Sequence, residues 1–209
     1  DEAQAELDAG RPAEAIVALK SALQSHAESA PIRLLMGRAL LKAGDHPAAA
    51  IELQKALDLG ANADEVVPLL AEALLGAGQL KTLLDNLGKT GLGRPAAQAA
   101  LKASLASARL LLGQGQQGEE DVRQALAADP SNLAANLLQA RIVAGRGDFD
   151  QALALVDKAG AAHPGQAEVS VLKGELLWVG KRDAAGASAA FQAALKVDPR
   201  YLPAHKLMV

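Results

Sequence analysis

Cysteine is absent from this chain of 209 residues, which excludes disulfides and cysteine-ligated metal sites. Aromatic residues are scarce, since only Phe149, Trp178, Phe191 and Tyr201 are present. The net charge is −3 and no run of Lys or Arg occurs, so we expect no nucleic-acid partner. No apolar stretch approaches the roughly 18 residues of a membrane span, so we expect no direct membrane insertion of this segment.

The residues that are present favour helices. Hydrophobic residues make up 50% of the chain, and alanine and leucine supply most of them. Both are strong helix formers, as are the Glu, Gln, Lys and Arg around them. Few aromatic and β-branched residues argue against a β protein. The composition therefore predicts an all-α fold.

Glycine recurs along the chain at spacings of 34 or 35 residues, with an apolar helical segment before and after each one. A small residue lies seven positions before the glycine, as at Gly37, and a larger apolar residue lies nine positions after it, as at Leu53. Small residues let the two helices of a hairpin approach closely, and the larger ones fill the space beside the next hairpin. The repeated turn glycines are Gly10, Gly44, Gly78, Gly113 and Gly147.

A helix–turn–helix unit of this length and pattern resembles the tetratricopeptide repeat, which implies a right-handed α-solenoid. Asp45 and Asp148 follow their turn glycines and are expected to cap the second helices. A one-residue slip is expected in the last turn, at 181–183, and a longer loop over 88–95. We predict a single array over 1–209, cut from a longer protein, with complete hairpins at 30–60, 63–88, 94–128, 132–161 and 165–197 and partial or irregular units at 1–26 and 200–209.

Three groups of residues could suggest catalysis or ligand binding, but each has a structural explanation. Residues 113–118 fit the dinucleotide fingerprint G-x-G-x-x-G, but they fall on a turn between helices rather than after a strand. The four histidines lie in different repeats without metal-ligand spacing. The acidic residues 119–121 are expected in the first turn of a helix, where negative charge is favourable. We therefore predict no catalytic residues, no cofactor, no metal and no enzymatic activity.

The concave groove of such a solenoid is the expected binding site, since its mixed apolar and charged surface suits an extended peptide or a partner helix. Two positions are open for Trp178, because it could lie exposed on the groove or pack between repeats. The predicted groove residues are Leu34, Arg38, Leu41, Lys42, Glu65, Glu72, Ser107, Leu137, Arg141, Val171, Glu175 and Trp178.

A narrower resemblance rests on three blocks, LKSALQ at 19–24, RLLMGRALLKAGD at 33–45 and ELQKALDLGA at 52–61. They are similar to the amino-terminal repeats of the tetratricopeptide lipoprotein of bacterial exosortase (PEP-CTERM) systems. That resemblance implies a lipid-anchored periplasmic scaffold for protein sorting and exopolysaccharide production, with cytoplasmic location as the alternative. A scaffold of a polysaccharide secretion complex, or the repeat region of a larger enzyme or regulator, would also fit the repeats. We expect a protein or peptide partner, together with end-to-end self-association through exposed repeat ends.

Overall fold

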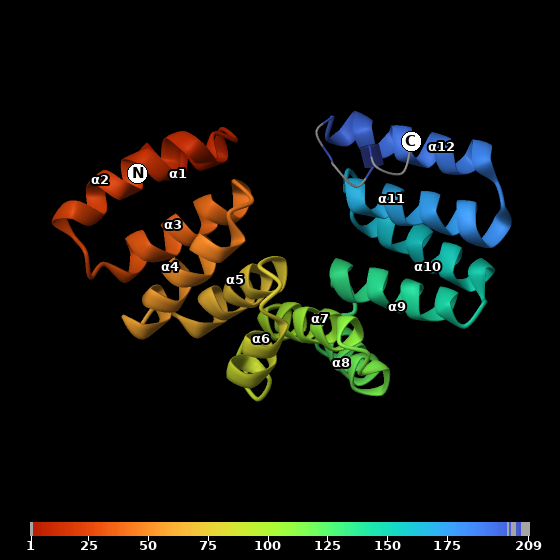
Figure 1. Cartoon of the computed structure of the whole chain (residues 1–209), viewed down its shortest axis with the longest axis horizontal. Coiled ribbons are helices and arrows are strands. Elements are labelled where there is room, and N and C mark those ends of the chain that lie inside the picture. The colour runs from red at the N-terminus through yellow and green to blue at the C-terminus, as the bar shows by residue number, and fades with distance from the viewer. Residues whose placement is uncertain (1, 200, 202–203, 206–209) are drawn as a thin grey trace. The chain divides into compact units, whose positions relative to one another are not determined.

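The computed structural model describes residues 2–199, 201, 204 and 205, and these residues form helices joined by short turns (Figure 1). No strand occurs in these ranges, so the predicted all-α fold class is confirmed. None of the helices in the described part is both long and apolar enough to cross a membrane. The elements are α1 (Glu2–Asp8), α2 (Pro12–Ser25), α3 (Ala30–Lys42), α4 (His46–Asp58), α5 (Ala63–Gly76), α6 (Leu80–Leu87), α7 (Pro95–Leu111), α8 (Gly115–Ala128), α9 (Leu133–Gly145), α10 (Phe149–Ala162), α11 (Ala167–Leu176), the π-helical turn η1 (Leu177–Lys181) and α12 (Ala184–Val197).

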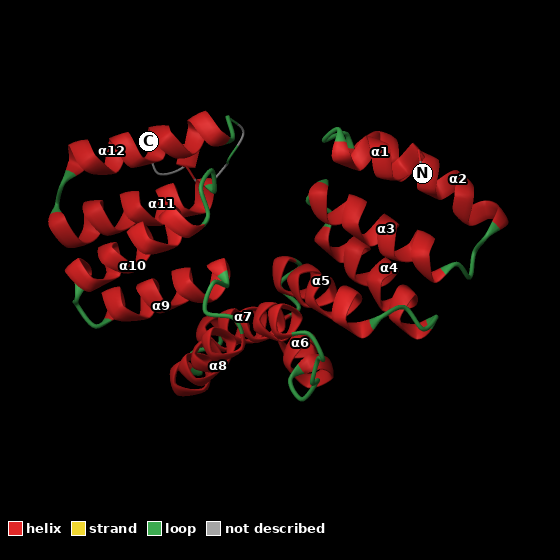
Figure 2. Ribbon diagram, turned by 180° about the vertical axis from the view of Figure 1, so that it is seen from behind, coloured by secondary structure: helices red, strands yellow, loops and turns green. Residues whose placement is uncertain are grey.

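The chain divides into two compact units, residues 1–121 and 122–209, with the division inside α8. In unit 1, each helix from α1 to α7 packs on the next, and α1, α3, α5 and α7 also contact one another in that order. In unit 2, α9 to α12 pack in sequence and α9 contacts α11 (Figure 2). We call the surface formed by α1, α3, α5 and α7, or by α9 and α11, the first-helix face of its unit. A single uninterrupted array over 1–209 stays a prediction.

The turns inside the hairpins follow the sequence pattern. Gly44 has a φ of +79°, a left-handed conformation that a side chain disfavours, and the other four turn glycines share it. Asp45 accepts a hydrogen bond at Oδ1 from the backbone N–H of Ala48 at 3.2 Å. Asp148 accepts the equivalent bond from Gln151 at 3.0 Å. Both predicted caps are confirmed.

Close contact between paired helices explains the small residues. A Cβ atom added to Gly37 would overlap the side chain of Leu53, and one added to Gly174 would overlap the ring of Phe191. Leu53 and Phe191 are both buried, so they occupy the space that the glycines leave open. The pairing of a small residue before the turn with a larger one after it is confirmed at these two hairpins.

The last hairpin contains one extra residue. Asp45 donates its backbone N–H to the carbonyl of Leu40, five residues earlier, at 2.9 Å. The corresponding Asp183 N–H bonds instead to Leu177, six residues earlier, at 3.0 Å. The π-helical turn η1 absorbs the additional residue, and Arg182 takes the left-handed position with a φ of 53°. The expected slip at 181–183 is confirmed.

The third hairpin is irregular, as the glycines after it predict. Its second helix, α6, has only eight residues, and Leu83 occupies a buried position where other repeats carry a small residue. The loop between α6 and α7 is held to α5 by Asp64. The carboxylate of Asp64 accepts hydrogen bonds from the backbone N–H groups of Gly93 at 2.8 Å and Arg94 at 3.1 Å.

Candidate functional site

A hollow of about 300 Å³ lies on the first-helix face of unit 1. Three successive first helices contribute to it: α1, α3 and α5. Apolar side chains from each helix line it, and charged or amide side chains surround them. It brings together four of the predicted groove residues. The lining residues are Gln4, Leu7, Arg38, Leu41, Lys42, Leu69 and Glu72.

Gln4, Leu7 and Leu69 are lining residues that the sequence prediction missed. The repeat register contained the signal for two of them. Gln4 lies six residues before its turn glycine, as Arg38 does, and Leu7 lies three residues before it, as Leu41 does. Because the helix at 2–8 belongs to a partial unit, the predicted groove began only at the first complete hairpin.

The two cations that line this hollow differ in their contacts. Lys42 donates a hydrogen bond from Nζ to the backbone carbonyl of Leu7 at 3.1 Å, so it neutralises the C-terminal end of α1. Arg38 is exposed, and within the described ranges no acceptor lies within hydrogen-bonding distance of its guanidinium. The hollow therefore combines an apolar floor with a guanidinium, that of Arg38, which has no hydrogen-bond partner among the described residues.

Unit 2 carries an arginine and a glutamate, Arg141 and Glu175, at the repeat positions that Arg38 and Glu72 occupy in unit 1. Arg141 donates from Nη1 to Glu175 Oε2 at 2.8 Å, and both were predicted groove residues. Loss of water around Glu168 raises the pKa of its carboxyl, and the positive charge of Arg141 partly offsets this effect. Burial raises the pKa of Tyr201, and the nearby carboxylate of Glu168 raises it further. The first-helix face of unit 2 is thus a cluster of mutually interacting polar groups.

Several predicted groove residues are not accessible. Leu137 and Val171 are only 8% and 4% exposed, so their placement on the groove surface is corrected. Val171 packs in a cluster with Ala194, which shows that this position of the repeat faces the neighbouring helix. Ser107 is half-buried and donates its hydroxyl to the carbonyl of Ala103 in its own helix at 3.0 Å. Leu34 is half-buried as well, whereas Glu65 is exposed.

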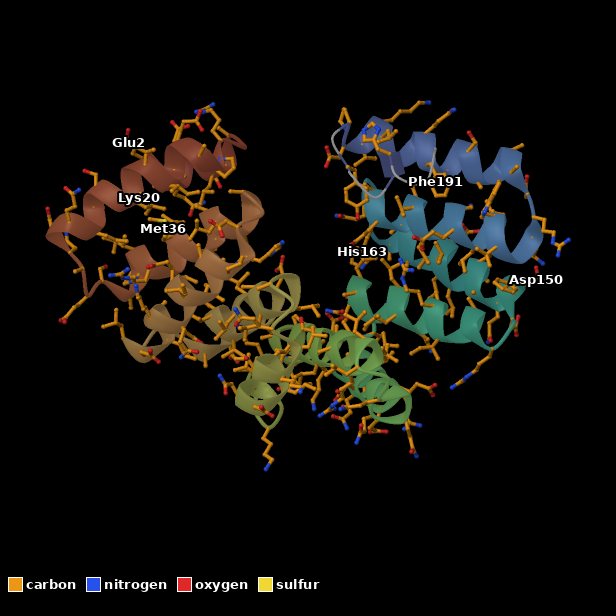
Figure 3. The ribbon with its side chains drawn as sticks, viewed as in Figure 1. Glu2, Lys20, Met36, Asp150, His163 and Phe191 are labelled. Atoms are coloured by element: carbon orange, nitrogen blue, oxygen red, sulfur yellow. The ribbon has the colours of Figure 1, made fainter. Side chains whose placement is uncertain are left out.

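Trp178 lies on the π-helical turn and is 60% exposed, beside Val179, which is 68% exposed. The exposed fraction favours a surface position over packing between repeats. Figure 3 shows Phe191, by contrast, on α12 next to α11, where its ring fills the space beside Gly174. The two aromatic side chains of this hairpin therefore differ in role, since one is in the core and one is accessible to a partner.

A second hollow of about 410 Å³ lies among α4, α5 and α6 of unit 1. It is lined in part by Ala50, Ile51, Leu70 and Leu74, and Ile51 is an exposed large apolar residue. The repeat pattern does not predict this hollow, although α6 ends early, at Leu87, and leaves this part of the unit incompletely covered.

Charged residues at the start of α8 have a role other than the one predicted. The helix begins at Gly115 and its first turn holds no acidic residue, so the predicted first-turn position of residues 119–121 is wrong. Asp121 is 1% exposed and pairs with Arg109, and with Lys102 Nζ at 3.4 Å, both on α7. The helix-dipole explanation for Asp121 is wrong, and a buried ion pair between α7 and α8 replaces it.

A sequence model described as tetratricopeptide repeat matches residues 6–73 and 109–176, more than half of the chain. The chain belongs to the tetratricopeptide repeat (TPR) family. The two matched segments place Arg38 and Glu72 of unit 1 at the positions of Arg141 and Glu175 in unit 2. No curated protein sequence matches the chain significantly.

Solved TPR structures share the fold. A TPR protein from Parabacteroides merdae has a TM-score of 0.73 at 15% identity, covering 98% of this chain and 79% of that chain. A thermophilic TPR protein from Thermus thermophilus has a TM-score of 0.67 at 20% identity, covering 85% and 96%. PilF from Pseudomonas aeruginosa has a TM-score of 0.63 at 18% identity, covering 99% and 93%. At these identities the likeness shows the fold alone.

The glycine-rich motif occupies the TPR hairpin turn, as the sequence analysis expected. Gly113 has a φ of +76° and α8 begins at Gly115. A Cβ atom on Gly118 would lie 2.8 Å from Leu110 Cγ, so this glycine is required for helix packing. Each glycine of the motif that the structure constrains therefore has a role within the repeat.

Proposed function

We propose that this chain is a scaffold that holds a protein or peptide partner against the first-helix faces of its units. The observation that carries the proposal is the hollow of unit 1, where three successive first helices present an apolar floor beneath charged side chains. A surface of this kind suits an extended segment or a partner helix, because apolar contacts supply affinity and charges select the partner. TPR proteins as a family bind protein or peptide partners, which supports the same function.

The proposal makes the chain a binding module rather than an enzyme. The one cofactor-like motif lies on a hairpin turn, and its glycines are explained by turn conformation and helix packing. Turnover of a substrate by the isolated chain would contradict this part of the proposal.

We further propose that the full-length protein is lipid-anchored in a bacterial envelope, faces the periplasm and takes part in exosortase (PEP-CTERM) protein sorting and exopolysaccharide production. The support is the sequence likeness of the blocks at 19–24, 33–45 and 52–61. Cell fractionation and protease accessibility in spheroplasts test the location. Recovery of the full-length protein only from the cytoplasmic fraction would contradict it.

Affinity capture from envelope extract tests the scaffold function. The full chain is compared with a variant in which Arg38, Arg141 and Trp178 are replaced by alanine, since all three are exposed on first helices or η1. A control variant carries alanine at Val17, Lys20 and Lys158, which are exposed on second helices.

We expect partners to be lost from the first variant and retained by the control. Equal retention by both variants would contradict a partner site on the first-helix faces. Recovery of polysaccharide-export proteins in place of sorting proteins would contradict the narrower assignment to the exosortase system.

A further inference from the structure

The hollow of unit 1 and the equivalent surface of unit 2 differ in one respect that bears on ligand chemistry. Arg38 and Arg141 occupy the same position of the repeat. The guanidinium of Arg141 is bonded to Glu175 at 2.8 Å, whereas in the described part of the chain no acceptor lies within hydrogen-bonding distance of the guanidinium of Arg38. Only the arginine of unit 1 is therefore available to a ligand without breaking an existing ion pair.

The surroundings of Arg38 define what could bind there. Leu7, Leu41 and Leu69 line the hollow, and its volume of about 300 Å³ is at the lower end of the range for small-ligand sites. That space accommodates one apolar side chain and a short stretch of backbone. An arginine beside such a surface favours a carboxylate, because a charge-assisted hydrogen bond to a guanidinium is among the stronger polar contacts in proteins.

The reach of the carboxylate selects its source. Lys42 is already bonded to the carbonyl of Leu7, so Arg38 is the cation of the hollow that remains for a ligand. A chain-terminal carboxylate is attached directly to the backbone of the last residue, so it cannot extend toward Arg38 independently of a side chain that is seated on the floor. An Asp or Glu side chain is on a flexible stem and can reach Arg38 while the neighbouring apolar residue occupies the floor.

We propose that the hollow of unit 1 binds an internal acidic peptide segment, with an apolar side chain on Leu7, Leu41 and Leu69 and an Asp or Glu carboxylate paired with Arg38. This inference rests on the proposed scaffold function and names the chemical class of its partner. Unit 2 does not bind the same segment in this way, because Glu175 already neutralises Arg141.

Selection of peptides from a random displayed library on the immobilised full chain tests the inference. Selected sequences are synthesised with blocked termini and a fluorescent label, and their affinities are measured by polarisation. We expect sequences that combine a Leu, Ile, Met or Phe with a nearby Asp or Glu. Arg38→Ala should weaken binding about tenfold or more, the size of one lost charge-assisted hydrogen bond.

Matched variants separate this contact from a general charge effect. Lys20→Ala removes an exposed cation from a second helix of the same unit and should leave the affinity unchanged. Replacing the acidic residue of the peptide by its amide should weaken binding to the wild type but not further weaken binding to Arg38→Ala. Melting temperatures equal to that of the wild type show that both variants are folded.

Four results would overturn the inference. These are selected peptides without acidic residues, equal effects of Arg38→Ala and Lys20→Ala, binding that requires a free carboxyl terminus, and failure to select any sequence. None of them contradicts the scaffold function by itself, since capture of a partner from envelope extract through another part of the first-helix faces would still support that function.

Discussion

Arg141 on α9 and Glu175 on α11 form an ion pair at 2.8 Å although they lie 34 residues apart in the sequence. The separation equals one repeat, so the pair joins equivalent positions of two neighbouring first helices. The same positive charge acts on Glu168, whose carboxyl pKa is raised by loss of water and lowered by Arg141. One arginine thus pairs with Glu175 and also acts on the pKa of Glu168.

Glu168 keeps part of its surface exposed, but nearby protein atoms remove water from its carboxyl, so its pKa should lie above the usual value of 4.5 in the folded chain. Because the folded-state pKa is raised, the stability associated with the protonated carboxyl is present at low pH and is lost as the pH rises through the folded-state pKa. Glu168→Gln should therefore stabilise the chain at neutral pH and not at pH below 4.5. NMR titration of the carboxyl carbon and denaturant unfolding at several pH values measure the two effects.

Arg141→Ala tests whether the positive charge of Arg141 lowers the pKa of Glu168. Removal of the guanidinium takes away the interaction that lowers the pKa of Glu168, so the titration midpoint should move further upward. A midpoint that falls in this variant, or a wild-type midpoint below 4.5, would show that loss of water does not control this carboxyl.

Gly174→Ala should destabilise the chain by about 1–3 kcal/mol, the usual range for an overpacked core. The added Cβ would overlap the buried ring of Phe191, which cannot move away without disturbing α12. Thermal and denaturant unfolding measure the change.

Gly145→Ala provides the control for this substitution. Gly145 is also helical, but nothing lies within 4 Å of an added Cβ there. Because alanine is the better helix former, this variant should be as stable as the wild type or more stable, by up to about 1 kcal/mol. Equal losses in the two variants would mean that contact with Phe191 is not the reason for Gly174.

The fold could be predicted from the sequence because its determinants are local and repeated. The turn glycines, the caps at Asp45 and Asp148, and the small residues facing Leu53 and Phe191 each depend on spacing within one hairpin. Repetition of the same pattern several times made the periodicity unambiguous, and even the extra residue before Asp183 was detectable as a break in that periodicity.

The candidate site was less predictable because accessibility depends on contacts between hairpins. Val171 occupies a first-helix position yet is buried, while Trp178, further along the same helical segment, becomes exposed on η1. The pairing of Asp121 with Arg109 joins two helices whose rotation about their axes the repeat pattern does not specify. Side-chain pairing of this kind cannot be predicted from the repeat pattern alone.

The buried carboxylate of Asp121 should be important for the stability of unit 1. Asp121→Ala would leave the largely buried cations of Lys102 and Arg109 without their partner, and breaking a buried pair in this way costs about 3–5 kcal/mol. Asp157→Ala removes half of an exposed pair with Lys173 and should change stability by less than about 1 kcal/mol. Denaturant unfolding compares them, and similar effects would argue against the special role of Asp121.

Arg182 offers a substitution that should improve stability. It is the one described residue other than glycine with a positive φ, 53°, and this conformation disfavours an L side chain by about 1–2 kcal/mol. Arg182→Gly relieves that strain but increases the freedom of the unfolded chain, so we expect a net gain of about 0.5–1 kcal/mol. Gly147→Arg makes the reverse change at the equivalent turn, where φ is 88°, and should lower stability. Opposite shifts in melting temperature are the expected result, and a loss of stability in Arg182→Gly would show that the arginine side chain makes a contact that outweighs its backbone strain.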